Sequence, residues 1–144
     1  MKYVLLLLLL LLPLVLVGCE KEEEVDLVKN LCWACRDGDL RGVTSAIRAG
    51  ANVNTQDCGG YNQGTPLVIA AQRNSKEVLE LLIENGADVN LTGRGMVHKP
   101  LDWAIMRNYS EIIDILRKHG AETKYSDQEV KSYAERPPKR IPRK

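Results

Sequence analysis

The sequence predicts an all-α solenoid of about three helix-pair repeats joined by hairpin-like loops. The first indication is a phrase that the 144-residue chain carries three times. It reads Gly50-Ala51-Asn52-Val53-Asn54, then Gly86-Ala87-Asp88-Val89-Asn90, and last, in degenerate form, Gly120-Ala121-Glu122-Thr123. From position 50 to 86 and from 86 to 120, the glycine spacings are 36 and 34 residues. A period of about 33 residues is typical of stacked helix pairs.

The second indication is that the similarity extends beyond the glycines. With the Gly-Ala pairs in register, three further sets of residues coincide: Leu31, Leu67 and Leu101; Ala34, Ala70 and Ala104; Trp33, Ile69 and Trp103. One supersecondary unit is therefore reused. Because an aromatic residue at a repeated helical position usually packs in a core, we interpret Trp33 and Trp103 as packing residues rather than ligand contacts.

The middle copy shows the structure of the unit. Thr65 is a side-chain acceptor suited to a helix N-terminus, and Pro66 follows at the first helical position, where its missing N–H costs nothing. A second helix is expected over residues 76–85, ending at Gly86 because a left-handed residue after the last turn is least costly as glycine. Its expected buried side consists of Val78, Leu79, Leu81, Leu82 and Ile83.

The middle copy, from Thr65-Pro66-Leu67-Val68-Ile69-Ala70-Ala71 to Gly86-Ala87-Asp88-Val89-Asn90, resembles an ankyrin repeat. Val68 stands where the family usually has histidine, and Asn74 where it usually has glycine. The resemblance implies an ankyrin-repeat domain over residues 26–123, with copies at about 26–54, 64–90 and 99–123.

The outer copies depart from the middle copy as caps should. Ser45 replaces the equivalent of Leu81, and Arg117 replaces the equivalent of Ile83. A polar face at each end keeps a repeat stack soluble.

The N-terminal segment predicts a signal peptide over residues 1–18. Lys2 precedes an apolar run that is too short for a membrane span and ends in Leu16-Val17-Gly18-Cys19. This ending resembles a bacterial lipobox, which implies cleavage before Cys19 and lipidation of that cysteine. A plain secretory signal or an uncleaved anchor is the alternative.

The lipobox implies a lipid-anchored protein of the bacterial cell envelope that faces the periplasm. Glu20, rather than aspartate, after the lipidated cysteine favours the outer over the inner membrane. Residues 19–25 form a short acidic tether, and residues 124–144 are assigned to a polar, basic, proline-rich tail.

Catalysis has little support in the sequence. His98 is expected in a loop and His119 at a helix end, and no hydrolase elbow or phosphate-cradling glycine loop is recognisable. We therefore predict no enzymatic activity, no cofactor, no metal and no nucleic-acid partner.

The cysteines leave several possibilities. Cys32-Trp33-Ala34-Cys35 is a C-x-x-C motif, which could be a redox pair or, with Cys58 and His98, part of a metal site. Haem attachment is disfavoured because Arg36 follows the motif. The repeat alignment places Cys32 at the family's histidine position, which faces the neighbouring loop, and Cys58 lies in that loop. We favour a Cys32–Cys58 disulfide with Cys35 as a core thiol, and a Cys35–Cys58 pair is the alternative.

Ankyrin proteins usually hold partners with loop tips and the concave face of the first helices. The corresponding residues are Tyr61, Asn62 and Gln63 in the first loop, Arg94, Met96, Val97 and His98 in the second, and Arg36, Asp37, Gln72, Arg73, Met106 and Arg107 on the helices. They combine charge with adaptable apolar groups, as protein-binding surfaces do.

The resulting hypothesis is a non-enzymatic protein-binding module. Its most specific form is an immunity-type protein that binds and neutralises a toxic enzyme. One alternative is an accessory factor that supports an envelope enzyme such as a catalase. A third, of a different class, is thiol–disulfide exchange at Cys32 and Cys35.

Overall fold

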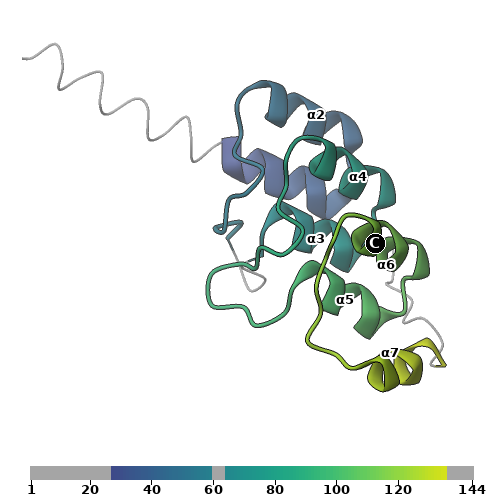
Figure 1. The fold of residues 1–144 in the computed structure, drawn as a ribbon. Helices are drawn as coiled ribbons and strands as arrows, with labels where there is room; N and C mark the ends of the chain where they lie inside the picture. The colour runs from purple at the N-terminus through teal and green to yellow at the C-terminus, as the bar shows by residue number, and fades with distance from the viewer. Residues whose placement is uncertain (1–26, 60–63, 136–144) are drawn as a thin grey trace, which may run out of the picture.

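The computed structural model describes residues 27–59 and 64–135, which form helices connected by loops (Figure 1). The first helix covers residues 27–37. It is followed by α2 (Leu40–Arg48), α3 (Pro66–Arg73), α4 (Lys76–Glu84), α5 (Pro100–Arg107), α6 (Ser110–Lys118) and α7 (Asp127–Ala134). The predicted all-α solenoid is confirmed. The predicted signal peptide and tether, the loop residues Tyr61, Asn62 and Gln63, and the last nine residues lie outside the described residues.

The first six helices form three pairs that stack in two layers (Figure 1). In one layer α3 packs against α5, and in the other α4 lies between α2 and α6. The loops between α2 and α3 and between α4 and α5 project to the same side of the stack (Figure 1). One continuous apolar cluster runs from Leu31 in the first helix to Leu116 in α6. Each pair therefore buries its apolar residues against its neighbours, as expected for a repeat array.

The helix starts are stabilised by two different devices. Thr65 Oγ1 accepts a hydrogen bond from Val68 N at 3.2 Å, which is the predicted cap of α3. At the start of α5 the threonine is replaced by Lys99, and the buried side chain of Asp102 accepts the hydrogen bonds that hold this end of the helix. Its Oδ2 accepts from Lys99 N at 2.9 Å, and its Oδ1 accepts from the hydroxyl of Thr123 at 2.5 Å. Asp102 thus connects the third helix pair to the loop that follows it.

The repeated phrase has a structural explanation. Gly50, Gly86 and Gly120 adopt positive φ angles of 97, 85 and 79°, so each can reverse the chain after its helix. The second asparagine of the phrase bridges to the next copy. Asn54 donates from Nδ2 to Gly86 O at 2.9 Å and accepts at Oδ1 from Asp88 N at 2.8 Å.

Asn90 repeats this bridge to the third copy. Its Nδ2 donates to Gly120 O at 3.3 Å, and its Oδ1 accepts from Glu122 N at 2.8 Å. In the third copy Lys124 stands at the position of Asn54 and Asn90, and the neighbouring Glu122 pairs with Lys99 at 2.8 Å. The hydrogen bond from Lys99 and its positive charge lower the pKa of the Glu122 carboxyl.

A helix forms where the sequence analysis assigned only a tail. α7 begins at a capping box in which Ser126 Oγ accepts from Glu129 N and Glu129 accepts from Ser126 N. It packs against α5, with Val130 and Tyr133 partly buried against the core. α7 therefore covers one side of the last helix pair.

The prediction that both tryptophans belong to the core is wrong for Trp33. Its equivalent Ile69 is 3 % exposed, whereas Trp33 is 64 % exposed and Trp103 is half-buried. Ile69 lies in a central repeat with neighbours on both sides. Trp33 lies in the first pair, and no described element stands before it to cover the indole.

We expect Leu82→Ala to lower the free energy of unfolding by about 2–5 kcal/mol, because the buried Leu82 side chain would leave a cavity between α4 and its neighbours. Chemical denaturation followed by circular dichroism measures the change. Leu40→Ala is the matched control, since Leu40 is 43 % exposed and should cost less than about 1 kcal/mol. Equal losses in the two variants would show that the core is elsewhere.

Asn54→Ala removes both bonds of one inter-repeat bridge and should destabilise the protein by about 1–2 kcal/mol. Thermal melts compared with those of Gln128→Ala, an exposed residue of α7, provide the measurement. An unchanged melting temperature in Asn54→Ala would mean that the loop bridges do not contribute to stacking.

Candidate protein-binding surface

The predicted binding surface is best defined around the third repeat, in the loop before α5 and on α5 itself. Val97, in the loop before α5, is 75 % exposed, and its neighbours Met96 and His98 are half-buried. A valine side chain with this exposure adds little buried apolar area to the fold. Exposed apolar side chains beside adaptable methionine are a usual feature of protein-binding sites.

His98, Trp103 and Arg107 form one cluster next to Val97. The rings of His98 and Trp103 meet edge to face, with centroids 5.4 Å apart and an interplanar angle of 60°. The Arg107 guanidinium carbon lies 5.9 Å from the centroid of the Trp103 ring. This is the range of a cation–π interaction, which restrains an otherwise flexible arginine and presents its charge in a fixed place.

Helix geometry explains why these side chains meet. Met106 and Arg107 lie three and four residues after Trp103 on α5, so both are neighbours of Trp103 on the helix surface. His98 reaches the same face from the loop that leads into α5. The cluster thus combines two aromatic rings and a positive charge, and the thioether of Met106 lies on a neighbouring position of the helix.

Two polar atoms of the cluster are buried without a hydrogen-bond partner, His98 Nδ1 and Trp103 Nε1. A buried polar atom without a hydrogen-bond partner destabilises the folded protein, and in native proteins such atoms usually call for a specific explanation, for example a functional role. The repeat pattern predicted a packing role for Trp103 and did not reveal its contacts with His98 and Arg107. The only signal was its neighbours, since an aromatic residue lies between a predicted loop histidine and a predicted helix arginine.

The other predicted contact residues divide into three groups. Asp37, Arg73 and Arg94 are exposed, and Arg36 is half-buried. Gln72 differs from the prediction, because it is 5 % exposed and its Nε2 is buried without a partner. Tyr61, Asn62 and Gln63 lie outside the described residues.

The charge on the described part of this surface is mostly positive. It carries four arginines, Arg36, Arg73, Arg94 and Arg107, against the single carboxylate of Asp37. Arginine is enriched at protein interfaces, where it pairs with carboxylates of the partner. The described contact residues therefore carry a net positive charge.

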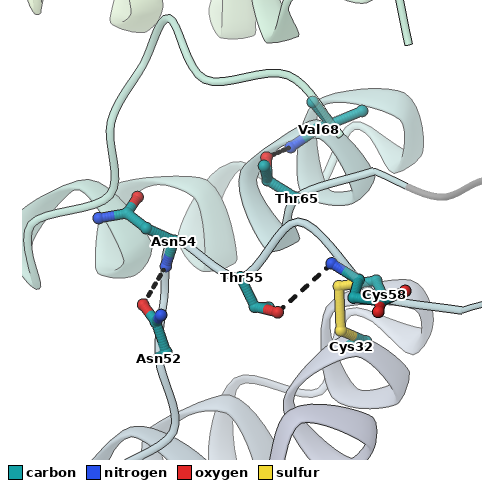
Figure 2. The surroundings of a disulfide bond; sticks show 8 residues. Cys32, Asn52, Asn54, Thr55, Cys58, Thr65 and Val68 are labelled. Atoms are coloured by element: carbon teal, nitrogen blue, oxygen red, sulfur yellow. Dashed lines mark hydrogen bonds between the residues drawn. A yellow bond between two sulfur atoms is a disulfide. The ribbon is translucent and has the colours of Figure 1, made fainter. Parts of the chain in front are cut away.

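The structure joins Cys32 to Cys58, with Cα atoms 5.4 Å apart (Figure 2). This is the pairing that the repeat alignment favoured. It links the first helix to the loop that precedes α3, on the side where the Asn52–Asn54 turn and the Thr65 cap also lie (Figure 2). A cross-link that closes a loop of this size is worth about 3 kcal/mol by reducing the freedom of the unfolded chain. The same bond removes Cys32 and Cys58 from the metal site considered above.

Cys35 is an unpaired and buried thiol. Burial raises its pKa to about 12, so it remains protonated at neutral pH. A protonated thiol is a poor nucleophile. The two cysteines of the C-x-x-C motif therefore have different roles: Cys32 forms the disulfide to the loop, and Cys35 is a core residue.

Residues 27–59 and 64–135 contain neither a metal-binding group nor a membrane-spanning helix. In these two stretches, no group of three or more histidine, cysteine or acidic residues is arranged to bind a metal ion. None of their helices has the length and apolarity needed to cross a bilayer.

These features define a class of protein, a stack of short helix pairs that presents loops and one helix layer to a partner. The chain belongs to the ankyrin-repeat family, since the family model for three ankyrin repeats matches residues 31–127. This family generally acts as a non-enzymatic module for protein–protein interaction.

Two known proteins illustrate the similarity. Ankyrin repeat and SOCS box protein 6 of Homo sapiens is 42 % identical over 67 residues, which are 46 % of this chain and 15 % of that protein. Ankyrin repeat-containing protein YIL001W of Saccharomyces cerevisiae is 36 % identical over 59 residues, 41 % of this chain and 11 % of that protein. Because the chain spans so little of these relatives, the similarity concerns the repeats and not the whole proteins.

We expect the Cys35 thiol to resist alkylation in the native protein, because it is buried and protonated. Iodoacetamide treatment at pH 8 followed by mass spectrometry should leave the peptide that contains Cys35 unmodified until denaturant is added. Rapid native labelling of Cys35, or a labelled Cys32 without reductant, would contradict this assignment.

Proposed function

We propose that this protein is a lipid-anchored ankyrin module of the bacterial envelope that captures another protein without catalysis. In its most specific form it is an immunity-type protein, which binds and neutralises a toxic enzyme. The observation that carries the proposal is the exposed Val97 beside the cluster of His98, Trp103 and Arg107.

The chemistry of this cluster supports a protein rather than a small ligand. Hot spots of protein interfaces are enriched in tryptophan and arginine and lie near apolar groups that exclude water. Here Trp103 and Arg107 are already held together at 5.9 Å, so little side-chain freedom is lost on binding.

The surplus of arginine supports an acidic partner. A positive surface attracts a negatively charged protein over a distance and increases its association rate, and salt weakens this attraction. An inhibitor of a toxic enzyme benefits from rapid association. The proposal therefore expects tight, salt-sensitive binding to an acidic surface.

The lipid anchor of the proposal rests on the lipobox resemblance at Leu16-Val17-Gly18-Cys19. Mass spectrometry of the purified protein tests it directly. Acyl chains on an N-terminal Cys19 would support the anchor, and an N-terminus upstream of Cys19 would reject it.

We expect Arg107→Ala to weaken partner binding about 30-fold, the effect of losing a hot spot of about 2 kcal/mol. The full-length protein is used to capture its partner from envelope extracts, and the affinity of the purified pair is then measured by calorimetry at low and high salt. Arg117→Ala, which removes an exposed arginine of α6 in the same repeat, is the matched control and should bind like the wild type.

Unchanged affinity in Arg107→Ala would reject the cluster as the contact surface. If the captured partner is an enzyme, adding one equivalent of this protein should abolish its activity. A partner whose activity rises or remains unchanged would reject the immunity role and leave the binding function in place.

A further inference from the structure

The N-terminal end of the repeat stack exposes a large apolar side chain at a position that the next repeat covers, and a second exposed apolar side chain lies nearby in the sequence. Trp33 is 64 % exposed where Ile69 is 3 % exposed, and Leu40 at the start of α2 is 43 % exposed. Most caps of repeat proteins are polar on their outer side. A tryptophan in this place requires a different explanation.

Trp33 stands at the edge of a shallow hollow of about 440 Å³ between the first helix and α2. Small residues, including Ala34, Gly42 and Ala46, form part of its lining, and Leu27 also borders it. Gly42 permits the close approach of the two helices, since a Cβ added there would lie 3.0 Å from the Ala34 side chain. Asn30, Asp37, Asp39 and Ser45 complete the lining, so the hollow is only partly apolar, and Trp33 is the one aromatic side chain in its lining.

The polypeptide enters the domain at this same surface. Leu27 is the first described residue, and it borders the hollow. Cys19, the proposed site of lipidation, lies eight residues earlier in the sequence. Eight residues span at most about 29 Å even when fully extended. A lipid on Cys19 would keep this end of the stack next to the bilayer.

The charges near this end indicate which force would act. Within residues 27–49 there are four basic and two acidic side chains, but Glu20, Glu22, Glu23, Glu24 and Asp26 precede them. This acidic run opposes attraction to an anionic membrane. Association would therefore depend on the indole, which favours the interfacial layer of a bilayer because one end is apolar and the N–H is polar.

We infer that the N-terminal end of the repeat stack, centred on Trp33, rests in the interfacial layer of the membrane that holds the Cys19 anchor. The inference rests on the lipid anchor of the proposed function. It also sets an orientation. The first repeat lies on the membrane, and the cluster of His98, Trp103 and Arg107 on the third repeat is directed toward the aqueous compartment, where a partner can reach it.

The two tryptophans provide the test. Trp103→Phe leaves only Trp33, and Trp33→Phe leaves only Trp103. Each acylated full-length variant is reconstituted into vesicles of phosphatidylethanolamine and phosphatidylglycerol with brominated acyl chains, which quench nearby indoles. We expect the emission of Trp33 to fall about twofold or more, as for an indole in the interfacial layer. The emission of Trp103 should remain unchanged, and high salt should not restore that of Trp33.

Each of the following results would contradict the inference. An acylated protein with unquenched Trp33 overturns it while the proposed anchor stands, and a protein without acyl chains overturns both. Equal quenching of the two tryptophans rejects the orientation. Loss of quenching in high salt would mean that charge, not the indole, holds the domain to the membrane. If Trp33 becomes shielded in detergent as protein concentration rises, a second copy of the chain covers this end instead.

Discussion

Each helix pair of this protein buries its apolar residues only by packing against the next pair, and the rest of the structure depends on this constraint. The packing of α3 against α5, and of α4 against α2 and α6, creates one apolar cluster from Leu31 to Leu116. A single pair of helices this short would not be stable in water. The asparagine bridges between loops and the Cys32–Cys58 disulfide help to keep neighbouring pairs in register.

The loops achieve this by directional bonds rather than by burial. Asn54 and Asn90 each use both ends of the side-chain amide to join one loop to the next. At the third copy no such bridge is needed, and Asp102 instead binds the hydroxyl of Thr123 and the amide of Lys124. The Cys32–Cys58 disulfide adds a covalent link at the first loop. A scaffold secured in this way can present exposed groups such as Val97 without losing its shape.

The two ends of the stack are closed differently. At the C-terminal end, α7 packs on α5, and the rings of Tyr125 and Tyr133 meet edge to face at 5.4 Å. At the N-terminal end, Trp33 remains exposed in a hollow that is otherwise lined mainly by small and polar residues. This asymmetry supports separate roles for the ends, with the proposed membrane contact at the first repeat and partner capture at the third.

The sequence by itself determined the repeat, its period and the start and end of the helices in the middle copy, because these depend on local chemistry. Thr65, Pro66 and Gly86 act on their own backbone, and the repeat register was enough to favour Cys32 over Cys35 as the partner of Cys58. The capping box at Ser126 and Glu129 was also visible in the sequence, although α7 was not assigned from it.

Only the tertiary structure decided which repeated positions are covered. Trp33, Ile69 and Trp103 are equivalent in the repeat, yet one is exposed, one is buried and one is half-buried in contact with His98 and Arg107. Gln72 was expected on the surface and is buried. The physical reason is that the exposure of a side chain depends on the repeat beside it, and the last neighbour at each end is not encoded in the repeat itself.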